Sequence, residues 1–165
     1  MSRSLSVEPS IIDKAKSAGI NYVYVNKKDF INNDEFEEHL IEIIKQTKSE
    51  FIIMAGWMKI MSKKFINAFK NKIINIHPSL LPSFKGSNAI KQTLKSGCLI
   101  AGCSVHFVEE EVDSGDLIIQ GSFAVEVGDN EESFTSKMHS LEHKILPIGI
   151  YIAGLNYRKN TMDKN

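Results

Sequence analysis

The stretch that decides the fold is Asn75-Ile76-His77-Pro78-Ser79-Leu80-Leu81-Pro82-Ser83-Phe84-Lys85-Gly86. Its first residues continue an apolar run from Ile73, which predicts a strand, and Pro78 ends that strand because proline has no N–H for the ladder. Asn75 and His77 are two residues apart, so both side chains leave the strand on the same side. Ligands of open α/β sheets bind at the carboxyl ends of strands, where this pair would lie. The spacing alone also allows a structural histidine that is bonded to a neighbouring carbonyl.

Alternating strands and helices are predicted on both sides of this stretch. Upstream, the apolar patterns indicate a helix at 9–18, a strand at 20–25, a helix from Asn33 or Asp34, a buried strand at 51–55 and a helix at 62–69. Downstream, they indicate a helix at 89–94, strands at 99–108 and 117–127, and a final helix after Gly128 that Pro147 should kink or interrupt. The alternation predicts a single α/β domain over residues 1–165, with a mostly parallel sheet flanked by helices.

The bulk composition excludes several classes of protein. Lys+Arg and Asp+Glu each number 20, so no net field attracts nucleic acid or an anionic membrane. The most apolar tract, at 145–155, is far shorter than the about 20 residues that span a bilayer. Cys98 and Cys103 fit neither a metal pattern nor a disulfide framework, and we expect small core residues in a reducing compartment. The first residues contain no apolar signal segment, so a cytoplasmic protein is expected, and no pattern assigns an oligomeric state.

Two sequence blocks carry a resemblance to a known family. The first is the stretch at 75–86, and the second is Ser104-Val105-His106-Phe107-Val108 followed by Val112-Asp113-Ser114-Gly115. The segment Leu117-Ile118-Ile119-Gln120 and the pair Glu142-His143 continue the match in register. Together these blocks resemble the folate-dependent glycinamide ribonucleotide formyltransferases. Related deformylases tend to carry a second histidine where Pro78 stands, and methionyl-tRNA formyltransferases tend to have glycine there and a further tRNA-contacting domain.

The resemblance implies a Rossmann-like formyltransferase fold. It also implies transfer of a formyl group from 10-formyltetrahydrofolate to the amine of glycinamide ribonucleotide, a step of purine biosynthesis. Attack of the amine on the formyl carbon places negative charge on oxygen, which needs hydrogen-bond donors arranged beforehand. The match assigns these donors to the amide of Asn75 and a protonated His77, with Asp113 keeping the histidine charged and helping to carry the proton from the amine. Without the match, Asp113 would be interpreted as a turn residue.

The same resemblance implies two binding regions. The pterin of the folate is expected beside Asn75, against Met58, Lys59, Ile60 and Met61, and against the loop of Glu109, Glu110, Glu111, Val112 and Asp113. Gly56, His139 and Glu142 match positions that contact the ribonucleotide, although the family has glutamine where His139 stands.

A zinc pattern competes for part of this region. His139-Ser140-Leu141-Glu142-His143 fits H-x-x-E-H, in which the two histidines lie on one helix face. A third ligand is required downstream, but no glutamate follows Glu142, and Asp163 lies in the tail. We therefore expect no metal.

The beginning of the chain departs from the family pattern. Family members start with a strand and a Gly-rich turn that holds the substrate phosphate at a helix N-terminus. No such turn is present here, and Met1 falls within the second strand of the family pattern. The family's folate-contacting arginine is also replaced, and the residue nearest to its position in this sequence is Asn33. We expect either a reading frame that starts upstream of Met1 or a decayed, poorly folding fragment. The alternatives to ribonucleotide formylation are another 10-formyltetrahydrofolate enzyme, such as a deformylase, and a non-catalytic remnant that only binds folate.

Overall fold

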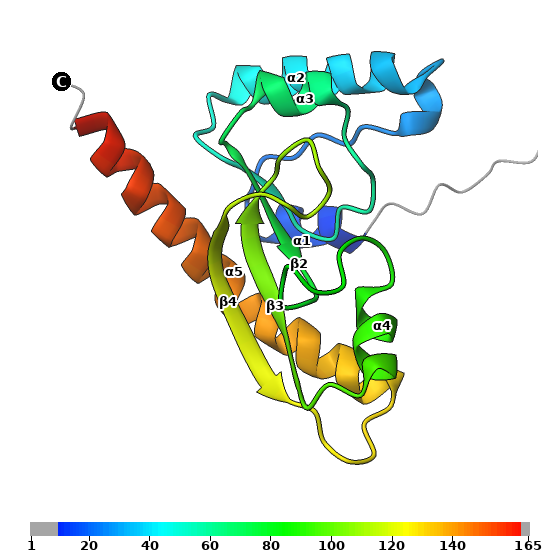
Figure 1. The fold of residues 1–165 in the computed structure, drawn as a ribbon. Coiled ribbons are helices and arrows are strands. Elements are labelled where there is room, and N and C mark those ends of the chain that lie inside the picture. The colour runs from blue at the N-terminus through cyan, green and yellow to red at the C-terminus, as the bar shows by residue number, and fades with distance from the viewer. Residues whose placement is uncertain (1–9, 163–165) are drawn as a thin grey trace, which may run out of the picture. The chain divides into compact units, whose positions relative to one another are not determined.

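The computed structural model describes residues 10–162, which are drawn in colour in Figure 1. The chain divides into two compact units, Met1–Leu40 and Ile41–Asn165. The first unit contains α1 (Ser10–Ser17), the 3-10 turn η1 (Lys27–Asp29) and the start of α2 (Asn33–Thr47). The second unit contains β1 (Ile52–Met54), α3 (Lys63–Ala68), β2 (Ile73–His77), α4 (Ala89–Ser96), β3 (Ile100–Phe107), β4 (Leu117–Ala124) and α5 (Glu131–Met162).

Most of the predicted elements are confirmed where they can be compared. The helix expected at 9–18 is α1. Pro9 lies outside the described residues, and so does Met1, for which a strand position was expected. α3 begins after Ser62, whose hydroxyl accepts a hydrogen bond from the backbone N–H of Phe65 at 3.2 Å. α4 ends at Gly97, whose φ of 72° is the left-handed conformation that glycine adopts at a helix end.

The strand predicted at 20–25 was wrong. Residues 20–26 have no regular secondary structure, and Ile20, Val23 and Tyr24 are exposed. Sequence preference alone does not make a strand, because each strand needs a hydrogen-bonded neighbour, and no described strand pairs with this segment. The helix expected from Asn33 or Asp34 is α2, which begins at Asn33. The side chain of Asn32 caps it by accepting from the backbone N–H of Glu35 at 2.9 Å.

The described strands form one mixed sheet in the order β1-β2-β3-β4. Only β1 and β2 run parallel, so the expectation of a mostly parallel sheet was wrong for these strands. β3 lies antiparallel to β2, with Ile74 paired to Phe107 and His77 paired to Ser104, because α4 and its loops return the chain at the same end of the sheet. β3 and β4 are joined directly by the loop at 108–116, and such a short connection requires antiparallel strands.

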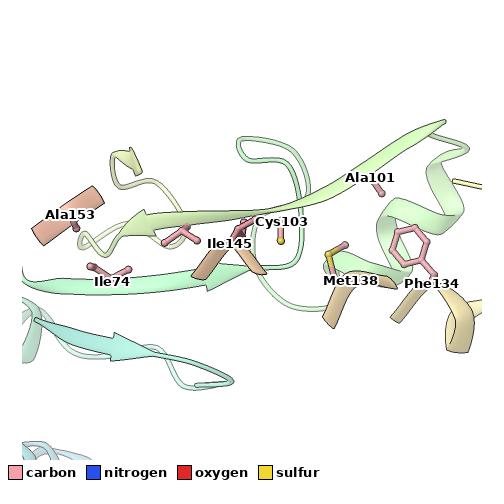
Figure 2. Close-up of a cluster of buried hydrophobic side chains, with 8 residues drawn as sticks. Ile74, Ala101, Cys103, Phe134, Met138, Ile145 and Ala153 are labelled. Atoms are coloured by element: carbon pink, nitrogen blue, oxygen red, sulfur yellow. The ribbon is translucent and has the colours of Figure 1, made fainter. Parts of the chain in front are cut away.

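The hydrophobic core of the second unit lies between one face of the sheet and α5. In β3, Ala101, Cys103 and Val105 alternate along the strand and point to this core, which also contains Phe134 and Met138 from α5 (Figure 2). Figure 1 shows α5 crossing behind β3 and β4. The helix approaches closely because it carries a glycine at position 149, where a Cβ would lie 2.7 Å from Cγ1 of Val105. The alternate residues of β3 are therefore left for the opposite face.

Two further expectations differ from the structure. β1 was expected to be buried on both faces, but Ile52 and Ile53 are half-buried, because β2 is its one neighbour among the described strands. α5 continues to Met162 without interruption at Pro147. Over residues 10–162, no helix combines the length and the apolar character that crossing a membrane requires.

Candidate active site

The sheet places Asn75 and His77 on the same face, as their spacing predicted. Asn75 lies opposite His106 of β3, and His77 lies opposite Ser104. Their neighbour Ile74 points to the hydrophobic core, so the polar face is the one turned away from that core. The antiparallel register therefore brings a second histidine, which the sequence patterns did not single out, next to the predicted pair.

Both ring nitrogens of His77 face acceptor oxygens. Nε2 lies 2.9 Å from the carbonyl oxygen of Phe84, in the loop that follows β2. Nδ1 lies 3.3 Å from Oδ2 of Asp113. A neutral imidazole has one N–H, so only the imidazolium donates to both oxygens. A histidine with a purely structural role would be bonded to a neighbouring carbonyl, and His77 has such a partner at Nε2. The carboxylate of Asp113 at Nδ1 adds a charged partner.

Asp113 lies between two histidines and is nearly buried, with 9% of its side chain exposed. Its Oδ1 lies 3.6 Å from Nε2 of His106, and its Oδ2 accepts the backbone N–H of Gly86 at 2.8 Å. The residue has a φ of 50°, in the left-handed region that aspartate tolerates better than most residues. Unfavourable backbone conformations of this kind are concentrated at functional sites, where the surrounding structure holds them in place.

His106 is the site residue that sequence reasoning missed. Its Nδ1 lies 2.7 Å from the carbonyl oxygen of Phe107, and its Nε2 lies 3.4 Å from Nδ2 of Asn75. Burial lowers the pKa of His106, and the nearby charge of His77 lowers it further, although the carbonyl of Phe107 and the carboxylate of Asp113 act in the opposite direction. The neutral ring donates from Nδ1 and accepts the amide of Asn75 at Nε2. Its position within the second sequence block could have indicated that His106 belongs to the site. Its hydrogen-bond partners, however, depend on the register between β2 and β3.

The predicted folate-contacting residues fall into two groups in the structure. In the segment at 58–61, Met58 and Ile60 are exposed, whereas the side chain of Met61 is buried. In the loop at 109–113, Glu110 and Glu111 form ion pairs. Lys63 Nζ lies 2.7 Å from Oε2 of Glu110, and Lys85 Nζ lies 3.3 Å from Oε1 of Glu111.

These ion pairs connect the loop at 109–113 to α3 and to the loop that follows β2. The hydrogen bond from Lys63 holds the pKa of the Glu110 carboxyl below its usual range, and Asn67 donates a second bond to the same carboxylate at 3.2 Å. α3 on one side and the loop after β2 on the other therefore contact the segment that carries Asp113. Glu109 is half-buried and Val112 is exposed.

The three predicted ribonucleotide-contacting residues lie in different surroundings. Gly56 has a φ of 67°, which favours glycine, in the exposed segment after β1. His139 is exposed and lines an open groove of about 630 Å³ along α5, whose other lining residues are Glu131, Glu132, Thr135, Ser136, Ser140 and His143. Glu142 is half-buried, and burial raises its pKa, although the charges of His139, His143 and His77 act in the opposite direction. The groove does not include Asn75, His77 or Asp113. Among residues 10–162, no three His, Cys, Asp or Glu side chains form a group suited to a metal ion.

The raised pKa of Glu142 predicts how stability depends on pH. The ordinary value is 4.5, so above pH 4.5 the unfolded chain releases this proton while the folded chain still holds it. The free energy of unfolding therefore falls as the pH rises from 4.5 through the higher folded-state pKa. We expect Glu142→Gln to raise the melting temperature at pH 8 by a few degrees and to have little effect at pH 4. Glu132→Gln, at an exposed position of the same helix, is the matched control, and equal melting curves for wild type and Glu142→Gln at pH 8 would contradict the assignment.

Comparison with known proteins gives a consistent result. Residues 5–150 match the family model described as formyl transferase. The chain is 36% identical over 152 residues to a phosphoribosylglycinamide formyltransferase of Bacillus subtilis, covering 92% of this chain and 78% of that protein. It is 40% identical over 141 residues to the trifunctional purine biosynthetic protein adenosine-3 of Bos taurus, covering 86% of this chain but spanning only 14% of the bovine protein.

Solved structures show the same relationship. The phosphoribosylglycinamide formyltransferase of Campylobacter jejuni superposes with a TM-score of 0.79 at 41% identity, covering 85% of this chain and 72% of that one. The α/β fold class predicted from the sequence is thereby confirmed, although the described sheet is mixed. The family model matches most of this sequence, and the alignment with the Bacillus subtilis relative covers most of both chains. This chain therefore belongs to the formyl transferase family.

Proposed function

We propose that this chain transfers a formyl group from 10-formyltetrahydrofolate to the amine of glycinamide ribonucleotide, as a step of purine biosynthesis. The observation that carries the proposal is the buried cluster in which Asp113 lies 3.3 Å from His77 and 3.6 Å from His106, beside Asn75. The names of the bacterial and bovine relatives support the choice of substrate. The family match at residues 5–150 extends over most of both compact units, which supports treating the chain as a single formyltransferase domain, and we place it in the cytoplasm.

The chemistry follows from the groups in the cluster. The amine nitrogen forms a bond to the formyl carbon, and the carbonyl oxygen gains negative charge. Asn75 Nδ2 is one donor for that oxygen, and the Nε2–H of His77 is a second once the oxygen takes the place of the Phe84 carbonyl. Asp113 accepts the proton lost by the amine, and the bond from the formyl carbon to the folate nitrogen then breaks as that nitrogen is protonated. His106 is in a position to orient the amide of Asn75.

Two sets of residues are proposed to bind the substrates. The exposed side chains of Met58 and Ile60, with Lys59 and the neighbouring Met61, cover the pterin on one side. The backbone of the loop at 109–113 contacts its polar edge on the other side. The ribonucleotide is assigned to Gly56, Glu142 and His139, of which His139 lines the groove on α5.

The test is a transfer assay with the purified chain, 10-formyltetrahydrofolate and glycinamide ribonucleotide. We expect formylated ribonucleotide to appear only when both substrates are present. Formate released without the acceptor would instead show a deformylase. Folate binding without any turnover, unchanged by His77→Ala, would show a non-catalytic folate-binding protein, and either result would overturn the proposal.

A further inference from the structure

The loop after β2 is attached to the neighbouring strands through one serine and one glutamine. Ser104 of β3 is fully buried, and its hydroxyl donates to the carbonyl oxygen of Ser79 at 2.7 Å and accepts the backbone N–H of Leu81 at 3.0 Å. Gln120 of β4 donates from Nε2 to the same hydroxyl at 2.9 Å and to the carbonyl oxygen of Leu81 at 3.0 Å. The loop is therefore attached at three backbone groups.

This arrangement uses the full hydrogen-bonding capacity of the groups involved. A serine hydroxyl has one donor and two acceptor positions, and here all three are occupied. The amide nitrogen of Gln120 has two hydrogens, and both have partners. Loss of either side chain leaves backbone groups of Leu81 without these partners. The serine occupies the polar face of the sheet, because it alternates with the core residues Cys103 and Val105.

The same loop supplies two contacts to the catalytic cluster. The carbonyl of Phe84 lies 2.9 Å from Nε2 of His77, and the backbone N–H of Gly86 donates to Asp113 at 2.8 Å. Ser104 pairs with His77 across the two strands, but among the described residues neither its side chain nor that of Gln120 hydrogen-bonds to the side chain of His77 or Asp113. The side-chain bonds of Ser104 and Gln120 therefore act on the cluster through the backbone between Ser79 and Gly86.

We propose that Ser104 and Gln120 are positioning residues for formyl transfer, which hold the loop at 78–86 so that the N–H of Gly86 sets the orientation of Asp113. The inference rests on the proposed function for its catalytic consequence, while the hold on the loop is a property of the fold. Gln120 is the better residue to change, because its side chain is exposed and the substitution leaves the core intact. Methionine has a similar length and no N–H to donate, so Gln120→Met removes both bonds with little change in shape.

The experiment compares Gln120→Met with wild type in two measurements. In steady-state kinetics, we expect kcat to fall by about tenfold, the effect of one to two lost hydrogen bonds, while KM for both substrates stays within about twofold. In amide hydrogen exchange without substrate, we expect the N–H groups of Leu81 and Gly86 to exchange about tenfold faster, while those of α5 exchange as in wild type. Gln46→Met is the matched control, since Gln46 is an exposed glutamine of α2 and lies outside the loop at 78–86.

Ser104→Thr, which keeps the hydroxyl, should retain most of the rate, whereas Ser104→Ala should match or exceed the effect of Gln120→Met. Unchanged exchange at Gly86 in Gln120→Met would overturn the inference whether or not the chain is active. Faster exchange with an unchanged kcat would overturn the positioning role. A wild-type chain without transfer activity would refute the proposed function, and the exchange measurement would still decide whether the pair holds the loop.

Discussion

Asp113→Asn is expected to lower kcat for formyl transfer by at least tenfold, and by about a hundredfold if general-base catalysis is lost entirely. The carboxylate lies within 3.6 Å of both His77 and His106. An amide of the same size has no negative charge to balance the imidazolium of His77, and it is a far weaker base for the proton of the attacking amine. The measurement is steady-state formylation of glycinamide ribonucleotide with both substrates saturating.

The fold should survive this substitution, since asparagine also tolerates the left-handed conformation that Asp113 adopts at φ 50°. Its remaining side-chain oxygen can still accept the N–H of Gly86. Asp116→Asn is the matched control: it changes an exposed aspartate in the same loop and should leave kcat within about twofold, as expected of a surface substitution. Turnover near wild type in Asp113→Asn would refute the role given to this carboxylate.

Of the substitutions proposed for this chain, Gly115→Ala is expected to lower the free energy of unfolding the most. A Cβ at this position would lie 1.9 Å from the carbonyl oxygen of Phe107 and 2.7 Å from its carbonyl carbon, so the obstacle is backbone that cannot move aside. The same turn is closed by the N–H of Phe107, which donates to the carbonyl of Asp116 at 2.9 Å. We expect a loss of about 3 kcal/mol in the free energy of unfolding, at the upper end for overpacking. That loss corresponds to a melting temperature lower by about 6–12 °C.

Activity should fall together with stability in Gly115→Ala, because the loop that must shift carries Asp113. Gly154→Ala is the control, since a Cβ there meets no atom within 4 Å. Position 154 lies within α5, where alanine is favoured over glycine by about 1 kcal/mol, so the control should be neutral or slightly stabilising. Thermal unfolding of the three proteins separates these outcomes, and an unchanged melting temperature for Gly115→Ala would contradict the geometry.

Local sequence determined the helices, most strands and the family. The capping serine at position 62, the glycine at 97 and the apolar alternation of β3 each specify a local conformation through short-range sterics and hydrogen bonding, so they could be predicted without coordinates. The two-residue spacing of Asn75 and His77 likewise fixed the side of the strand on which they lie. The sequence blocks at 75–86 and 104–115 carried the family.

Only the tertiary structure decided which groups meet. The failure of the segment at 20–25 to form a strand, the antiparallel direction of β3, and the position of His106 against Asn75 all depend on pairing between residues far apart in the sequence. The backbone N–H and C=O groups of any apolar run of suitable length can pair with those of another strand. Local preference therefore selects neither the partner strand nor the register. For the same reason, the attachment of the loop at 78–86 by Ser104 and Gln120 could be found only once three separate segments had been brought side by side.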